Sequence, residues 1–188
     1  MIFEKYVPYS HSDFVFKIAR SPDDLDGFFN LRRQIFCEEQ RVFESDDRDP
    51  IDEKMMPIVC KTLLAGMEDV VAGVVRIDER APGVWHGSRL GVASEFRRLR
   101  HFSPGVAIRN LQPCYHGLGA LGAGLIYKAV STANAIGCHE FHATVQKQNA
   151  RFFTRLHWEP ISETMLHGIP HVKMRADLNH YQPAHRVA

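Results

Sequence analysis

Hydrophobic and polar positions along the chain switch between the period of a β-strand and that of a helix. Residues 15–19 alternate and predict a strand. Residues 21–24 (SPDD) combine an N-cap serine, a proline at the first helical position and an acidic side chain three positions on, so they predict a helix to about Gln40. Its inward face also carries Arg32 and Glu39, which plain amphipathicity would not place there.

The rest of the pattern predicts the order β-α-β-β-β-α-β-α-β-β. This order is typical of an α/β or α+β sheet with helices packed on its faces. Gly66 opens a turn that makes the second and third strands a hairpin, and Gly137 ends the second helix. The expected strands are residues 15–19, 58–65, 70–77, 85–92, 141–145, 161–165 and 172–178; a short helix is expected over 149–156 and an acidic loop over 43–54.

Composition indicates one globular domain spanning residues 1–188, with 45% apolar and 24% charged residues. The 23 basic and 22 acidic residues give a net charge of +1, which argues against a nucleic-acid partner and a polybasic membrane anchor. No two of the four cysteines form a CxxC pair, so no zinc ribbon, thioredoxin site or other metal centre is expected. Reduced thiols in the cytoplasm fit best. The N-terminus has no signal-peptide pattern, and no membrane span is expected.

A glycine-rich turn opens the second helix and offers an anion site. Glycines let backbone N–H groups approach a phosphate, and the start of a helix carries partial positive charge. No lysine-serine/threonine pair follows, which disfavours an ATPase P-loop, and no acidic residue completes a dinucleotide fingerprint. The alternative is that the small residues only allow close packing of the helix on the sheet. The glycines are Gly117, Gly119, Gly122 and Gly124.

The segments on either side of this turn resemble the GNAT superfamily of N-acetyltransferases. Residues 88–98 (SRLGVASEFRR) resemble the L-x-V strand that leads to the R-x-x-G-x-G/A turn of that family. Residues 148–158 (QNARFFTRLHW) resemble its N-x-x-x-x-Y-x-x-x-G-F segment. The resemblance covers about residues 58–178, and is weaker over 15–57. It implies a mixed, mostly antiparallel sheet of six or seven strands with a central strand splay, flanked by helices.

The resemblance also implies N-acetylation of a small-molecule amine by direct transfer from acetyl-CoA. The donor would lie where the strand of Leu90 and Val92 parts from the strand of residues 141–145, with its pantetheine paired to the backbone of Leu90 and Val92. Asn149 would hydrogen-bond the donor, and Phe152 would pack beside it. The pyrophosphate would rest on the amides of the turn, contributed by Gly117, Leu118, Gly119, Gly122 and Ala123.

Three departures from the family pattern affect this site. Arg97 and Arg98, expected to contact the donor, are separated from the glycines by an insertion of roughly 16 residues near positions 101–116. We expect this insertion to cover the cofactor mouth or to form a homodimer contact. Phe153 stands at the usual tyrosine position, so no phenol there protonates the leaving thiolate. His157 and Trp158 replace the usual Gly-Phe pair.

Three residues are candidates for proton transfer or acceptor binding. His86 lies on the expected substrate side of its strand, and an imidazole pKa near 6.5 suits a general base; the alternative is a structural histidine at a strand end. Burial of Glu39 would raise the pKa of its carboxyl; the alternative is an ion pair with Arg32. His171, in the last hairpin, would border the acceptor pocket as a substrate residue, or be an exposed turn histidine.

A second constellation, R-x-x-x-F at Arg32 followed by Phe43 and D-x-D-x-x-D at residues 47–52, resembles the front of acyl-homoserine lactone synthases. That resemblance implies a site for S-adenosylmethionine shaped by Arg32 and Asp52. Carboxylates at an open pocket would favour a cationic acceptor, and the alternative is a solvated acidic loop. A third interpretation, a non-catalytic acyl-CoA-binding module, is supported by Phe153 and the altered glycine turn.

Overall fold

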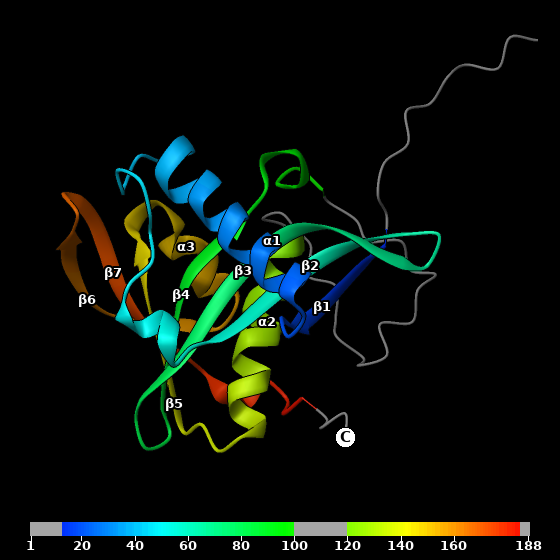
Figure 1. The fold of residues 1–188 in the computed structure, drawn as a ribbon. Helices are drawn as coiled ribbons and strands as arrows, with labels where there is room; N and C mark the ends of the chain where they lie inside the picture. Colours follow the sequence, from blue (N-terminus) through cyan, green and yellow to red (C-terminus); the bar gives the residue numbers. More distant parts are fainter. Residues whose placement is uncertain (1–12, 100–119, 185–188) are drawn as a thin grey trace, which may run out of the picture.

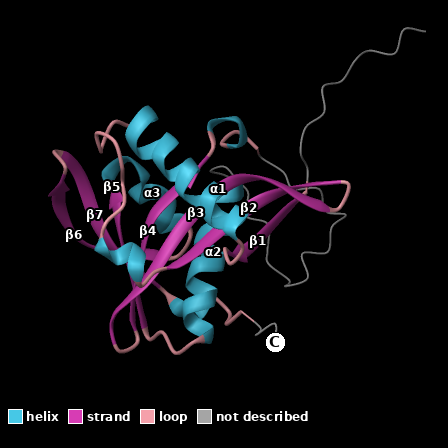
Figure 2. Ribbon diagram, in the orientation of Figure 1, coloured by secondary structure: helices cyan, strands magenta, loops and turns pink. Residues whose placement is uncertain are grey.

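A seven-stranded sheet lies between helices in the computed structural model, which describes residues 13–99 and 120–184 (Figures 1 and 2). The strands are β1 (Phe14–Ile18), β2 (Met56–Leu64), β3 (Met67–Ala81), β4 (Val84–Val92), β5 (Glu140–Gln146), β6 (Trp158–Leu166) and β7 (Ile169–Ala176). The α-helices are α1 (Pro22–Arg33), α2 (Ala120–Ala135) and α3 (Ala150–Arg155). The predicted order of strands and helices is confirmed.

The strand order across the sheet is β1-β2-β3-β4-β5-β7-β6. Every neighbouring pair is antiparallel except β4 and β5, which run parallel and are joined through α2. β2 and β3 form the predicted hairpin. The sheet is therefore mixed and mostly antiparallel, as the sequence resemblance implied.

The start of α1 follows the predicted capping box. The hydroxyl of Ser21 accepts a hydrogen bond from the backbone N–H of Asp24 at 3.1 Å, and the Asp24 carboxylate accepts from the Ser21 backbone N–H. The helix continues to Gln40 as predicted, but residues Gln34–Glu39 are π-helical, with the Gln40 N–H bonded to the carbonyl of Ile35. A π-helical turn takes more residues than an α-helical turn, so side chains after Arg33 leave the stripe expected from a regular helix.

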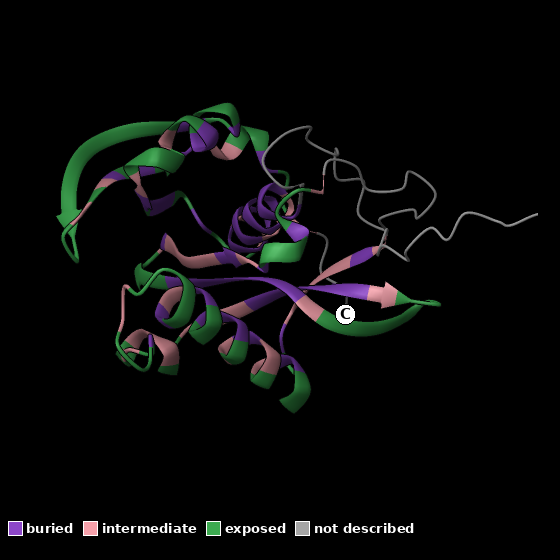
Figure 3. Cartoon of the chain, turned by 90° about the horizontal axis from the view of Figure 1, so that it is seen from above, coloured by how far each residue is buried: buried purple, intermediate pink, exposed green. Residues whose placement is uncertain are grey.

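Helices α1 and α2 pack on opposite faces of the sheet, and α2 is the more buried of the two (Figure 3). Two glycines mark how closely they approach. A Cβ on Gly91 of β4 would lie 2.7 Å from Cδ1 of Ile35, on the α1 face. A Cβ on Gly124 of α2 would lie 2.5 Å from the ring of Phe16 in β1. The core on both sides of the sheet therefore leaves no room for a side chain at these positions.

β4 and β5 separate part of the way along their length. They pair only from Val84, opposite Glu140, to Gly87, opposite Ala143. β4 then continues to Val92 and β5 to Gln146 without pairing to each other. This is the predicted central splay.

A β-bulge lies in β4 just beyond the point where the strands part. Val74 of β3 pairs with Gly91, whereas Arg76 pairs with Ser88, so β4 carries one more residue than β3 over this stretch. Within it, Arg89 has a φ of 53°. A bulge leaves its extra residue unpaired in the ladder and redirects the side chains beside it.

Several sequence predictions lie outside the described residues. They include the insertion near 101–116 and the turn residues Gly117, Leu118 and Gly119. The single domain over residues 1–188 stays a prediction. Among the helices that the structure describes, none combines the length and apolar character that a bilayer crossing requires.

Candidate functional site

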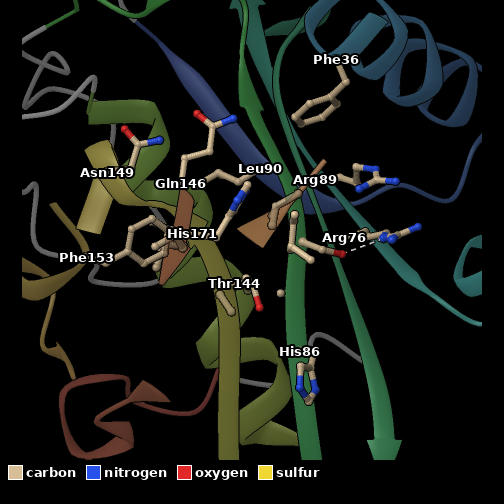
Figure 4. Close-up of a pocket in the computed structure, with 18 of the residues that line it drawn as sticks. Phe36, Arg76, His86, Arg89, Leu90, Thr144, Gln146, Asn149, Phe153 and His171 are labelled. Carbon is tan, nitrogen blue, oxygen red and sulfur yellow. Dashed lines mark hydrogen bonds between the residues drawn. The ribbon is translucent and has the colours of Figure 1, made fainter. Parts of the chain in front are cut away.

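A cavity of about 330 Å³ lies where β4 and β5 part (Figure 4). Its volume is at the lower end of the range for small-molecule sites. Leu90 of β4 and Val145 of β5 form opposite walls, and α2 and α3 close one side with apolar side chains. Polar side chains enter from the other elements. His86 lies at one end of the opening, and Gln146 and Asn149 lie at the other.

The carboxamide of Asn149 makes no capping bond at the start of α3. This residue occupies the N-cap of α3, where asparagine commonly accepts a hydrogen bond from the helix backbone. Here no such bond is made, and the exposed side chain lines the cavity. The predicted role of Asn149 toward an acyl donor is compatible with this geometry.

The two described glycines of the glycine-rich turn differ in how much space surrounds them. Packing against Phe16 accounts for Gly124, as the preceding section described. A Cβ on Gly122 would meet only Val92 among the described residues, at 3.9 Å, an ordinary van der Waals contact. Close helix–sheet packing therefore explains Gly124 but not Gly122, which leaves the anion-binding interpretation open for Gly122.

Arg97 is tied to the end of β4. Its Nε donates to the carbonyl of Val92 at 2.7 Å, and its Nη2 donates to the Glu39 carboxylate at 2.5 Å. One acceptor position of the Val92 carbonyl, predicted to pair with pantetheine, is therefore used within the chain. Arg98 is exposed.

The environment predicted for Glu39 is wrong. The residue is exposed and pairs with Arg97, neither buried on an inward stripe nor paired with Arg32. The π-helical turn explains the difference, because it rotates the residues after Arg33 away from the expected face. Glu39 is also absent from the cavity lining.

The two phenylalanines of α3 divide between core and cavity. Phe153 lines the cavity and packs edge-on against Trp158, with ring centroids 5.1 Å apart. Phe152, predicted to contact the donor, is buried in the core and does not line the cavity. Cavity contact therefore falls to Phe153, the residue at the usual tyrosine position.

Three arginines and three aspartates form a buried network beside the cavity. Arg32 is fully buried; its Nε donates to Asp47 at 2.8 Å and its Nη1 to Asp52 at 2.6 Å. Arg76 of β3 donates through Nη1 to Asp49 at 2.7 Å and to Asp52 at 2.8 Å. Asp52 therefore joins α1 to β3 through the loop that carries it.

Arg89 completes this Arg–Asp network from β4. Its Nε lies 2.9 Å from the Asp47 carboxylate, and its Nη2 lies 3.2 Å from that of Asp49. The carbonyl of Asp47 also accepts from Nη2 of both Arg32 and Arg89, at 3.2 and 2.9 Å. The whole loop is thus held by guanidinium groups from one helix and two strands.

The charges of the network shift the pKa of its members. Burial alone would raise the pKa of Asp52, but hydrogen bonds from Arg32, the Asp49 backbone and Arg76 hold it well below its usual range. Hydrogen bonds from Arg76 lower the pKa of Asp49. Burial would lower the pKa of Arg76, yet its aspartate partners raise it overall. These groups remain charged at neutral pH.

The solvated-loop interpretation of residues 47–52 is therefore wrong. Asp47 is 1% exposed, and the described carboxylates of this loop turn toward arginines. Arg32 and Asp52, predicted as substrate residues, do not line the cavity, whereas Arg76 and Arg89 do. The structure places Arg32 and Asp52 one layer behind the cavity wall.

His86 lines the closed end of the cavity, where β4 still pairs with β5. Burial, and then the charge of Arg80, lower the pKa of His86 to about 4, so its imidazole is neutral at pH 7. His142 lies beside it, with ring centroids 5.4 Å apart. Buried atoms with no partner among the described residues include Nδ1 of His86, Nδ1 of His142 and Oδ1 of Asp78, on three adjacent strands.

His171 lines the same cavity from β7, opposite Gln146. Its Nδ1 lies 2.8 Å from the carbonyl of Ile169. A carbonyl oxygen can only accept, so Nδ1 carries the proton and Nε2 of a neutral ring keeps its lone pair. This tautomer is the one that a general base using Nε2 requires.

Sequence reasoning missed the cavity residues Arg76 and Arg89, whereas Phe43, noted in the synthase-like constellation, does line the cavity, as does His167. The ring of Phe43 lies under the Arg89 guanidinium, 4.5 Å from its centre, and packs against His167 with centroids 5.0 Å apart. One signal was available: Arg76 interrupts the otherwise apolar stretch of residues 70–77 within β3. Nothing local to the sequence indicates that a loop some 40 positions earlier covers Arg89.

Comparison with known proteins identifies the fold. No protein-family model matches the sequence, and no curated protein matches it. A solved protein of Lactobacillus plantarum with a provisional N-acetyltransferase assignment superposes with a TM-score of 0.69 at 16% identity, over 87% of this chain and 97% of that one. Escherichia coli ElaA gives 0.64 at 15% identity, over 88% and 99%.

A synthase is also among the similar structures. BjaI, a CoA-dependent acyl-homoserine lactone synthase solved with S-adenosylmethionine and isopentyl-CoA, gives a TM-score of 0.58 at 16% identity, over 81% of this chain and 75% of that one. The chain therefore has the acyl-CoA N-acyltransferase (GNAT) fold, as its sequence resemblance predicted. Within the described residues no group of three or more histidine, cysteine or acidic side chains could hold a metal ion.

Removing the most buried arginine of the network tests its structural role. We expect Arg32→Ala to lower the free energy of unfolding by about 3–5 kcal/mol, because Asp47 and Asp52 lose a buried partner. Arg33→Ala is the matched control, since its pair with Glu38 is exposed and worth less than about 1 kcal/mol. Denaturant unfolding measures both. Equal losses would contradict the network's role.

His86 also makes a prediction about acid stability. Its pKa is lowered to about 4 in the folded chain, whereas an unfolded histidine binds a proton near pH 6.5. Its contribution to stability is therefore present above about pH 6.5 and is lost as the pH falls toward 4. We expect His86→Asn to lose less stability than the parent chain over that interval. Melting curves of both proteins at pH values within this interval provide the test. Equal losses of stability in the two proteins would argue against a desolvated imidazole.

Proposed function

We propose that this chain is an N-acetyltransferase that transfers an acetyl group directly from acetyl-CoA to the amine of a small molecule. The observation that carries the proposal is the parting of β4 and β5 after Gly87 and Ala143, with a cavity in the opening. An extended ligand that carries amides can pair with a free strand edge. Pantetheine has that chemistry. The cytoplasmic location expected from the sequence belongs to the same proposal.

The residues around the opening fit the donor. Leu90 offers backbone groups beside the bulge, and the uncapped carboxamide of Asn149 lies across the gap. The first turn of α2 contributes N–H groups that have no partner within the helix, and Gly122 leaves space beside them. An anionic pyrophosphate is favoured there by the helix dipole.

The chemistry requires a base, an oxyanion donor and a proton for the thiolate. Nε2 of His171 takes a proton from the acceptor ammonium, directly or through water, and the free amine attacks the thioester carbonyl. A backbone N–H of the bulged strand stabilises the tetrahedral oxyanion. As the C–S bond breaks, the attacking nitrogen, now positively charged, loses a second proton, which passes directly or through water to the thiolate, because Phe153 has none to give. Protonated His171 returns the first proton to solvent.

His86 is the alternative base. It is neutral at pH 7, but it lies at the closed end of the cavity, and its buried Nδ1 has no described partner that fixes its tautomer. His171 has such a partner in the Ile169 carbonyl. This difference favours His171 and gives His86 a role in the cavity floor.

A second candidate function is supported by the Arg–Asp network. An acyl-homoserine-lactone-synthase-like enzyme would use S-adenosylmethionine as the acceptor, and BjaI was solved with that molecule. The pairing of Arg32 with Asp47 and Asp52 fixes this segment as a layer behind the cavity wall that Arg76 and Arg89 form. Calorimetric titration with S-adenosylmethionine and with acetyl-CoA separates the two functions. CoA binding without turnover on any amine would indicate a non-catalytic module.

The donor site is tested at the start of α2. We expect Gly122→Glu to abolish detectable acetyl-CoA binding in calorimetry, because it places a carboxylate against the pyrophosphate. Asn149→Ala removes one neutral hydrogen bond and should weaken binding by about 10-fold or less. Ile136→Glu is the charge-matched control, since it adds the same charge at an exposed position just after α2 and should bind normally. Normal binding by Gly122→Glu would end the phosphate assignment.

The base is tested by comparing two histidine variants. We expect His171→Gln to lower kcat by about 100-fold or more, the usual range for loss of a general base. His86→Gln should lower it by less than about 10-fold, since no proton transfer is lost. The pH profile adds a second readout: with His86 as the base, the acidic limb would lie near its pKa of about 4. A larger loss for His86→Gln together with that limb would assign the base to His86.

A further inference from the structure

The described lining of the cavity holds several basic side chains and no carboxylate. Among the described residues, three arginines and three histidines line it, and no aspartate or glutamate does. Sites for polyamines or other cations would be expected to present carboxylates, because opposite charges attract most strongly where water is excluded. The arginines are Arg76, Arg80 and Arg89, and the histidines are His86, His167 and His171.

The acidic loop does not supply the missing carboxylates. Asp47 and Asp52 are buried behind the wall and accept hydrogen bonds from Arg32. Asp49 accepts from Arg76 and from the backbone N–H of Ile51. The reason for expecting a cationic acceptor, which was carboxylates beside an open pocket, therefore does not hold in the folded chain.

Arg89 has unused capacity for an anion. Its Nε and Nη2 are engaged by Asp47 and Asp49, whereas Nη1 has no partner among the described residues. The guanidinium lies over the ring of Phe43 and is 17% exposed, so its position is fixed but solvent still reaches it. An arginine held in this way can bind a carboxylate at little further cost in side-chain entropy.

The balance of charge around Arg89 points the same way. Burial and the neighbouring Arg76 lower the pKa of Arg89, and the opposing effect of Asp47 does not restore it. Arg76 differs, because its aspartates raise its pKa overall. Of the two network arginines that line the cavity, Arg89 is thus the one whose charge is compensated less.

We propose that the acceptor is an amine that also carries a carboxylate, as an amino acid does, and that Arg89 binds this carboxylate within the cavity. The inference rests on the proposed N-acetyltransferase function and specifies its substrate class. Arg89 stands at the bulge where β4 leaves β5, so a carboxylate held there places the amine of the same molecule beside the strand opening. Charge-assisted pairing of this kind contributes more than a neutral hydrogen bond.

Matched acceptor pairs test the proposal on the unmodified protein. The pairs are phenylalanine with phenethylamine, lysine with cadaverine, and S-adenosylmethionine with its decarboxylated form. With acetyl-CoA as donor, we expect kcat/KM from thiol release to be at least about 10-fold higher for the carboxylate member of the preferred pair, consistent with loss of one charge-assisted contact. Equal or better use of the decarboxylated members would overturn the proposal.

Arg89→Gln should bring the ratio within the preferred pair toward one, because the variant loses the cation that distinguishes the two members. Arg80→Gln is the control. That side chain also lines the cavity but pairs with Asp78 at 2.8 Å, so its removal should leave the ratio unchanged. Melting temperatures of both variants identify any loss of folding, and an unchanged ratio in folded Arg89→Gln would refute the assignment to Arg89.

Two further experiments distinguish failure of the carboxylate proposal from failure of the proposed N-acetyltransferase function. Succinyl-CoA in place of acetyl-CoA, with phenethylamine as acceptor, asks whether the anion belongs to the donor; preferential use of succinyl-CoA would overturn the acceptor assignment. Calorimetry of phenylalanine and phenethylamine on the protein with bound CoA needs no turnover. Absence of thiol release with every amine would defeat the proposed function, whereas tighter binding of phenylalanine would still support a carboxylate site.

Discussion

Charge compensation within the network of Arg32, Arg76 and Arg89 with three aspartates is the constraint on which the site depends. Each guanidinium comes from a different element: α1, β3 or β4. Burying any of these charges alone would be costly, and their mutual pairing in fixed geometry offsets that cost. The loop of residues 47–52 therefore cannot move without exposing unpaired charge. Because Arg76 and Arg89 also reach the cavity, the shape of one cavity wall is set by the same contacts that hold the loop.

The order of strands and helices could be predicted from the sequence because it depends on local signals. The Ser21–Asp24 capping box, the hairpin turn at Gly66 and the helix stop at Gly137 each act over a few residues, and each is found where it was expected. The splay of β4 and β5 was not a local signal. It followed from the resemblance to GNAT proteins, and the pairing that ends at Gly87 bears it out.

The site was less predictable because its partners are distant in the chain or depend on helix geometry. Glu39 fell on the wrong face because six residues of the first helix are π-helical, which a periodicity of 3.6 does not anticipate. Asp47 and Asp49 were identified as acidic, but the sequence does not show that they bind arginines 42 and 27 positions away, respectively. Arg89 was missed altogether, since its φ of 53° and the bulge that orients it arise from the register between two strands.

One acceptor in the network behaves differently from the carboxylates around it. The carbonyl of Asp47 receives bonds from both Arg32 and Arg89, and it belongs to the main chain. A peptide oxygen stays uncharged at every pH at which the protein would be studied. Replacing the side chain of residue 47 does not remove this oxygen. Acidification that protonates the aspartates would thus leave this carbonyl able to accept from both guanidinium groups, which join the loop to the first helix and the fourth strand. A variant with another residue at position 47 would still have this main-chain carbonyl as an acceptor for Arg32 and Arg89.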